Sequence, residues 1–124
     1  MAAKNKPIII STGMSTLQEV KDAVKWIEEV GNTDISILHC TSNYPAPYSE
    51  VNMNAMKTMM KSFSYPIGYS DHTKGYEIPI MAVAMGACII EKHFTLDKSM
   101  PGLLFAFHSV PVHFPASLPP DFLP

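Results

Sequence analysis

The stretch Gly68-Tyr69-Ser70-Asp71-His72-Thr73 and a later one, Ile89-Ile90-Glu91-Lys92-His93-Phe94, follow one pattern: apolar residues run into a polar cluster with a single histidine. A strand with a polar end, followed by a helix, is typical of a barrel of parallel strands, which carries its chemistry at the carboxyl ends of the strands. Neighbouring parallel strands lie about 4.8 Å apart. Two histidines at adjacent strand ends can therefore meet on one metal ion.

Strand-like and helix-like segments alternate along most of the chain. Short apolar runs predict strands over residues 6–10, 35–38, 65–69 and 86–90. Apolar residues at helical spacing predict helices over residues 15–30, 51–63 and 76–85. Such regular alternation indicates parallel strands joined by right-handed crossovers. The predicted fold class is therefore α/β, a partial TIM barrel of about four parallel strands with crossover helices, over residues 1–100.

The last part of the chain does not continue this pattern. Residues 99–120 contain no Asp, Glu, Lys or Arg, and proline recurs from Pro101 to Pro124 without a helical or strand period. Closely spaced prolines exclude a helix through this segment. We expect residues 101–124 to form an irregular, apolar, Pro-rich tail.

Size and composition exclude several classes of protein. A chain of 124 residues forms at most one domain, and a formal charge of −2 without a basic stripe argues against nucleic acid as a partner. The longest apolar run, residues 78–90, is too short to span a bilayer. The first residues do not resemble a secretion signal, so we expect a cytoplasmic protein in which Cys40 and Cys88 are buried thiols. The methionines of residues 51–63 are expected to fill the core.

His72 and His93 are the candidate metal ligands. Neutral imidazole is a common ligand for divalent metals, and the carboxylates of Asp71, Glu91 and Asp97 lie close in sequence as hydrogen-bond partners for such ligands. A histidine at a strand end can also have a purely structural role, and the sequence leaves both interpretations open. His39 is expected to be a core histidine, with a Cys–His pair formed with Cys40 as the alternative.

The remaining polar groups at strand ends could bind substrate. Because side chains alternate along a strand, Glu91 should point opposite to Lys92, where it could act as a base or hydrogen-bond acceptor, or could pair with a lysine. Residues 11–13 lie between a strand and a helix, where backbone N–H groups can hold a phosphate or cap the helix, and Lys6 could add charge. Tyr44 could pack on a sugar or anchor its loop.

Four motifs in order resemble one family. Residues 6–14 (KPIIISTGM), 38–45 (LHCTSNYP), 68–73 (GYSDHT) and 90–97 (IEKHFTLD) resemble the sialic acid synthase family, which includes N-acetylneuraminate synthase and its legionaminate and pseudaminate relatives. The resemblance covers residues 6–102. It implies a TIM barrel that condenses phosphoenolpyruvate with an N-acetylated amino sugar, such as N-acetylmannosamine, and releases phosphate. It also implies a divalent metal, Mn²⁺ or Mg²⁺, and homodimers of the full-length enzymes.

The same resemblance implies roles for individual residues. The metal would be held by His72 and His93 and would polarise the sugar aldehyde. Catalysis would use Glu91, placed against the sugar or the attacking water. Substrate contacts would come from Lys6, Ser11 and Ser70 for phosphoenolpyruvate, from Tyr44 for the sugar, and from Ser42, which stands where some relatives carry an asparagine.

The chain also departs from the family pattern. The family's Gly-Pro-Asp-His segment is replaced by Pro101-Gly102 followed by Leu103, so residues 101–124 resemble the product of a change of reading frame or a mispredicted gene end. The first half of the barrel and a small antifreeze-like domain have no counterpart. We therefore expect a synthase fragment that does not turn over substrate alone, because catalytic groups that act as a unit lose most activity together. The alternatives are a non-catalytic half-barrel that binds a metal or ligand, a different metal-dependent aldolase, and a pseudogene product.

Overall fold

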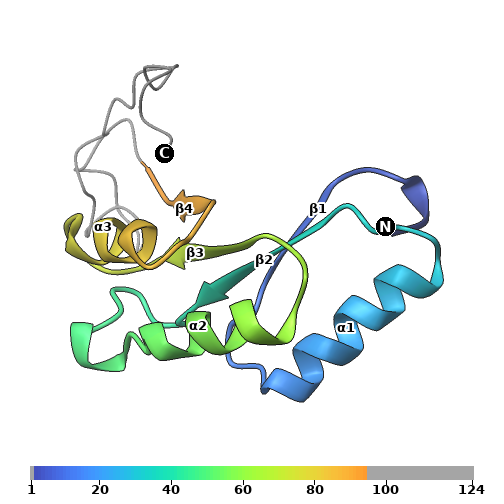
Figure 1. Cartoon of the computed structure of the whole chain (residues 1–124). Helices are drawn as coiled ribbons and strands as arrows, with labels where there is room; N and C mark the ends of the chain where they lie inside the picture. The colour runs from blue at the N-terminus through green and yellow to red at the C-terminus, as the bar shows by residue number, and fades with distance from the viewer. Residues whose placement is uncertain (1, 95–124) are drawn as a thin grey trace, which may run out of the picture.

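The computed structural model describes residues 2–94, and its framework is a curled sheet of four parallel strands. The strands are β1 (Ile8–Ser11), β2 (Ile35–Cys40), β3 (Ile67–Asp71) and β4 (Ile90–Lys92), in the order β1-β2-β3-β4. The helices are α1 (Leu17–Glu29), α2 (Met53–Ser62) and α3 (Glu77–Ala84), with short 3₁₀ turns at Ala2–Lys4 and Tyr48–Glu50 (Figure 1). The predicted partial TIM barrel is confirmed. The predictions for residues 101–124 and for Asp97 lie outside the described residues.

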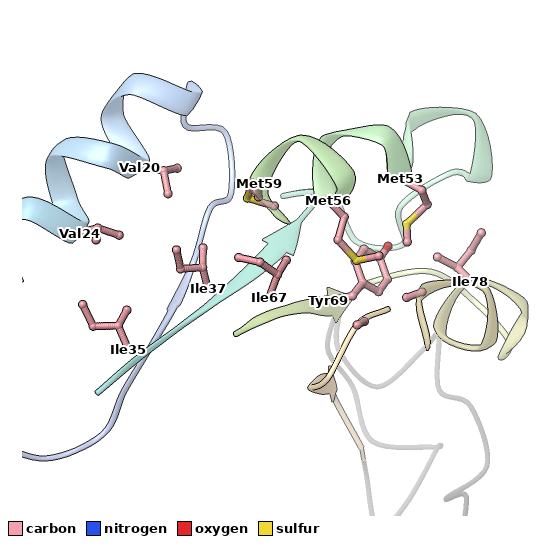
Figure 2. Close-up of a cluster of buried hydrophobic side chains, with 12 residues drawn as sticks. Val20, Val24, Ile35, Ile37, Met53, Met56, Met59, Ile67, Tyr69 and Ile78 are labelled. Carbon is pink, nitrogen blue, oxygen red and sulfur yellow. The ribbon is translucent and has the colours of Figure 1, made fainter. Parts of the chain in front are cut away.

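The hydrophobic core lies between one face of the sheet and the helices. Alternate strand residues, among them Ile37, Ile67 and Tyr69, pack against Val20 and Val24 of α1 and the methionines of α2 (Figure 2). The methionine face predicted to be core is confirmed, since Met53, Met56 and Met59 are all buried. The opposite face of the sheet, called the inner face below, carries Ser11, Leu38, Cys40, Ser70 and Glu91.

Helix α1 has a capping box at its amino end and a glycine after its carboxyl end. The Thr16 hydroxyl accepts from the Glu19 backbone N–H, and the Glu19 carboxylate accepts from the Thr16 N–H, which forms a capping box. Gly31 follows the helix with φ of +83°, a conformation that glycine adopts without the penalty that a Cβ would bring.

No helix within residues 2–94 has the length and apolar character to cross a membrane.

Each predicted strand has at least one wrong boundary, and the differences in β3 and β4 are the most important for the polar residues at the strand ends. The third strand runs to Asp71 instead of Tyr69, so Ser70 and Asp71 lie within β3. The fourth strand begins at Ile90, because Gly86 has φ of +102° and the Ala87 N–H donates to Ala82, so that these residues terminate α3. Cys88 in this segment is exposed, contrary to prediction, whereas Cys40 is buried.

Gly68 lies at a point in β3 where the neighbouring chain leaves no room for a side chain. A Cβ at this position would be 2.4 Å from the Ile89 carbonyl oxygen and 2.5 Å from Cδ2 of Leu38. The Tyr69 N–H donates to that same Ile89 carbonyl, at 2.9 Å. Backbone and side chain therefore fill the space that any other residue would need.

Stability is expected to fall as the pH drops below about 6.5, because the core histidine His39 must then be protonated. His39 is 7% exposed and its Nε2 is buried without a hydrogen-bond partner among residues 2–94. Burial lowers the pKa of His39, an effect that the Asn52 backbone partly opposes. Below pH 6.5 the unfolded chain therefore binds a proton at His39 more readily than the folded chain does. The free energy of unfolding that is present above pH 6.5 is lost as the pH falls through the lowered pKa of His39 in the folded state.

Denaturant unfolding of wild type and His39→Gln between pH 5.5 and 7.5 measures this effect. The variant should show a smaller loss of unfolding free energy on acidification. Equal pH dependence in the two proteins would contradict the assignment.

Candidate active site at the carboxyl ends of β3 and β4

Ser70 and Glu91 lie side by side on the inner face of the sheet. The two residues are register partners in the β3–β4 pair, and the Ser70 hydroxyl donates to Oε2 of Glu91 at 2.5 Å. Lys92 points to the other face, where it forms an ion pair with Asp71. The predicted opposition of Glu91 and Lys92 is therefore confirmed, and the partner of the Glu91 carboxylate is a hydroxyl group, not the neighbouring lysine.

His72 is held in one orientation by the loop that follows β2. Its Nδ1 lies 2.7 Å from the Thr41 carbonyl oxygen, which can only accept, so Nδ1 carries the proton and Nε2 carries the lone pair. The backbone carbonyl of His72 accepts from the Ala46 N–H at 2.9 Å. The Nε2 atom faces the Tyr44 hydroxyl and lies 3.5 Å from the Ser70 hydroxyl.

The electrostatics of His72 favour the neutral imidazole. Burial lowers the pKa of His72, while the Thr41 carbonyl and the charges of Asp71 and Glu91 oppose this shift. A neutral ring with its proton fixed on Nδ1 presents the Nε2 lone pair toward the inner face. This is the form in which histidine binds metals, with the other nitrogen donating to a carbonyl group.

His93 is the second ring of this cluster. The ring centres of His72 and His93 are 6.5 Å apart, and Tyr44 stacks on His72 at 3.8 Å and lies 5.7 Å from His93. Two imidazoles that share an ion have ring centres about 4.5–6.5 Å apart, because each nitrogen lies about 2.1 Å from the metal. The observed separation equals the upper limit of this range, which is reached only when the two nitrogens lie on opposite sides of the ion, so the rings would have to approach each other to bind one metal side by side.

Within residues 2–94, no group of three or more His, Cys, Asp or Glu side chains could hold a metal ion. Among the described residues, His72 and His93 are therefore a candidate pair of ligands without a third such side chain beside them. The carboxylate of Asp71 does not support His72 as the sequence indicated, because it accepts from Thr73 and pairs with Lys92 on the helix-facing side.

The loop after β1 comes close to the loop after β2. Gly13 has φ of +50°, and a Cβ there would be 3.0 Å from the Ser42 hydroxyl oxygen. The Thr12 hydroxyl accepts from the Cys40 N–H at 3.3 Å, which ties the two loops together. Ser11, at the end of β1, and Ser42 are exposed at this edge of the sheet.

Lys6 is not brought to this cluster. It precedes β1 at the amino ends of the strands, where its backbone carbonyl accepts from the Asn32 side chain at 2.9 Å. Ser70, Glu91 and the histidines lie at the carboxyl ends. The structure thus separates Lys6 from the other predicted substrate contacts by the length of a strand.

Sequence reasoning missed two neighbours of His72. The Cys40 thiol lies 3.7 and 3.8 Å from the two ring nitrogens, and burial raises the pKa of Cys40, which favours the neutral thiol. The Thr41 contact is made by a backbone carbonyl, which every residue type has, so the sequence could not predict it. The Cys–His alternative for His39 and Cys40 fails, because adjacent strand residues face opposite sides and His39 lies against Tyr69 at 5.7 Å.

Comparison with known proteins places this chain in a family. The NeuB family model matches residues 1–111. The chain is 54% identical over 105 residues to the N,N'-diacetyllegionaminic acid synthase of Legionella pneumophila, which covers 82% of this chain and 30% of that relative. It is 41% identical over 100 residues to the pseudaminic acid synthase of Campylobacter jejuni, covering 81% of this chain and 29% of that relative.

Solved structures agree with these sequence relatives. The N-acetylneuraminic acid synthetase of Leptospira borgpetersenii, crystallised with citrate, superimposes with a TM-score of 0.81 at 38% identity, over 87% of this chain and 38% of that one. A spore coat polysaccharide biosynthesis protein of Bacillus subtilis gives a TM-score of 0.82 at 40% identity, over 86% and 30%. The chain therefore spans about a third of the length of the relatives it matches, and by its sequence and its fold it belongs to the NeuB family.

Proposed function

We propose that this chain carries part of the active site of a synthase that condenses phosphoenolpyruvate with an N-acetylated amino sugar and releases phosphate. The observation that carries the proposal is the arrangement around His72. Its Nε2 lone pair faces the same side of the sheet as the hydrogen-bonded pair of Ser70 and Glu91. The names of the relatives, which are synthases of legionaminic, pseudaminic and N-acetylneuraminic acids, support the same class of reaction.

His72 and His93 would hold the divalent metal, Mn²⁺ or Mg²⁺, which this family membership implies. When bound, such an ion supplies a Lewis acid for the oxygen of a sugar aldehyde. The lone pair on Nε2 of His72 is oriented for this by the Thr41 carbonyl, without any change of tautomer.

Glu91 is the proposed proton acceptor of the reaction. The Ser70 hydroxyl donates to its carboxylate and so fixes one oxygen, while the exposed side chain leaves the other accessible to a sugar hydroxyl or an attacking water. Tyr44 is exposed at the rim and offers its ring to the sugar. Ser11, at the end of β1, and Ser42, in the loop after β2, are proposed phosphate or sugar contacts, and Lys6 is left out because it lies at the other end of the strands.

A segment exchange tests this proposal. Residues 6–94 would replace the matching segment in the full-length Legionella pneumophila relative, and formation of N,N'-diacetyllegionaminic acid would be measured. We expect the exchanged protein to retain product formation and the same protein with Glu91→Gln to lose it. An exchanged protein that melts cooperatively but forms no product, or that keeps full activity with Glu91→Gln, would refute the assignment.

Replacing Tyr44 with phenylalanine is expected to strengthen Mn²⁺ binding by about two- to tenfold. The Tyr44 hydroxyl occupies the Nε2 lone pair of His72 that a metal would use. A single hydrogen bond has a net value of about 0.5–1.5 kcal/mol, and its removal lowers the cost of metal binding by that amount. Calorimetric titration with Mn²⁺ measures the change.

Tyr48→Phe is the matched control, because the Tyr48 hydroxyl bonds to the Lys74 carbonyl and to Glu77, away from the histidines. It should leave the Mn²⁺ affinity unchanged. Weaker binding by Tyr44→Phe would show that this hydroxyl assists the metal and does not compete with it.

A further inference from the structure

An ion pair lies directly behind the two candidate ligands. Asp71 and Lys92 are register partners on β3 and β4, and each immediately precedes one of the histidines, His72 or His93. Their side chains meet on the helix-facing side of the sheet, with 0% of the Asp71 side chain and 16% of the Lys92 side chain exposed. Since side chains alternate along a strand, a contact on this side sets where the next residue of each strand emerges on the inner face.

The same pair also holds the backbone that follows His72. One carboxylate oxygen of Asp71 accepts from the Thr73 N–H at 2.9 Å and from the Thr73 hydroxyl at 2.8 Å. The Lys92 ammonium group donates to the Thr73 carbonyl at 2.8 Å as well as to the other Asp71 oxygen. His72 is therefore fixed on both sides in sequence, by Asp71 before it and Thr73 after it.

A role in stability alone explains this arrangement poorly. Burying a charge pair costs desolvation energy, and replacing such a pair with apolar residues of similar size is often neutral or stabilising. The ion pair instead holds the end of β3 at a fixed distance from the end of β4. The ring centres of His72 and His93, at 6.5 Å, are at the upper limit for sharing one ion, so a small shift between these strand ends would separate them.

We propose that Asp71 and Lys92 are positioning residues that set the separation and direction of the His72 and His93 rings, and thereby the affinity of the site for its divalent metal. The proposal deepens the proposed function and rests on it, because it assumes that these two imidazoles bind the metal. Neither residue would touch the ion or the substrate.

The experiment compares four forms of the full chain: wild type, Lys92→Met, Lys92→Arg, and the apolar double variant Asp71→Leu/Lys92→Met. Mn²⁺ affinity is measured from the electron paramagnetic resonance signal of free Mn²⁺, and folding from thermal melting. Lys92→Met should weaken Mn²⁺ binding about tenfold or more, the range for residues that orient metal ligands. Lys92→Arg should keep most of the affinity. Lys25→Met is the control, because it removes an exposed ion pair with Glu29, far from the site.

The double variant separates positioning from stability. We expect it to melt at a higher temperature than Lys92→Met, because it leaves no buried charge unpaired, but not to recover the Mn²⁺ affinity. Recovery of the affinity, or affinity that follows melting temperature across the series, would overturn the proposal.

A readout without metal separates this proposal from the proposed function. Nuclear Overhauser contacts between the stacked rings of Tyr44 and His72 report the ring position directly. If wild type binds no Mn²⁺, the metal assignment fails, and the ring contacts then decide the positioning role. Their loss in Lys92→Met and in the double variant, while Lys25→Met keeps them, would support it. Their persistence in both variants would overturn it.

Discussion

Gly68→Ala is expected to destabilise the chain by about 3 kcal/mol or more, a large fraction of the total stability of a small domain. The added methyl group would lie 2.4 Å from a backbone oxygen, that of Ile89, which cannot rotate away as a side chain does. Relief requires β3 and β4 to move apart, and this weakens the hydrogen bond from the Tyr69 N–H to the same oxygen. Denaturant unfolding followed by circular dichroism measures the loss.

Two further variants isolate the cause. Gly31→Ala adds a methyl group in open space at φ of +83°, so it should cost only the backbone strain of about 1–2 kcal/mol. Combining Gly68→Ala with Leu38→Ala removes the side-chain half of the clash but leaves the Ile89 carbonyl. We therefore expect no recovery in this double variant. Recovery would show that Leu38, and not the strand backbone, excludes a side chain at residue 68.

His72→Ala and His93→Ala are each expected to weaken Mn²⁺ binding by at least about 100-fold. Changes in groups that merely orient a metal ligand cost about 10–100-fold, and loss of the ligand itself should exceed that. The described residues offer no third His, Cys, Asp or Glu that could compensate. The affinity is measured by calorimetry at pH 7, where burial keeps the His72 ring neutral by lowering its pKa.

His39→Gln is the control for these two variants. His39 is a histidine at the end of β2, but it faces the core next to Tyr69 and lies on the other side of the sheet from His72. Its replacement should leave Mn²⁺ binding unchanged at pH 7. If all four proteins bind Mn²⁺ equally, the metal is not held by these histidines.

The architecture could be predicted from the sequence because its main signals are periodic. The apolar runs and the helical spacing of Val20 and Val24 correspond to single elements of the fold. The strand ends could not be predicted to the residue, because polarity was taken to mark the end of a strand. In a barrel the inner face near the carboxyl ends is itself polar, so Ser70 and Glu91 lie within strands and not after them.

The polar cluster of the candidate site could be predicted in its residue types but not in its contacts. His72, Glu91 and Tyr44 could be named, since each sits in a polar cluster at an expected strand end. The donor–acceptor pairs could not, because the partner of His72 is the backbone carbonyl of Thr41 and the partner of Glu91 is the hydroxyl of Ser70. The position of Lys6 was also not evident from the sequence, since its charge suggests a phosphate contact whereas its place before β1 puts its backbone at the opposite end of the sheet.

Each strand has one side that packs in the core and one side that faces the candidate site. The molecule is therefore far more sensitive to a change in the length of a strand than to the replacement of one of its residues. Deleting one residue inside β3 would carry Tyr69 to the reactive side and Ser70 into the methionine layer. The same deletion in the turn that contains Gly31 would leave both sides intact. Side chains at the rim can thus be exchanged with little effect on the fold, whereas an insertion or deletion is tolerated only in the connections between elements.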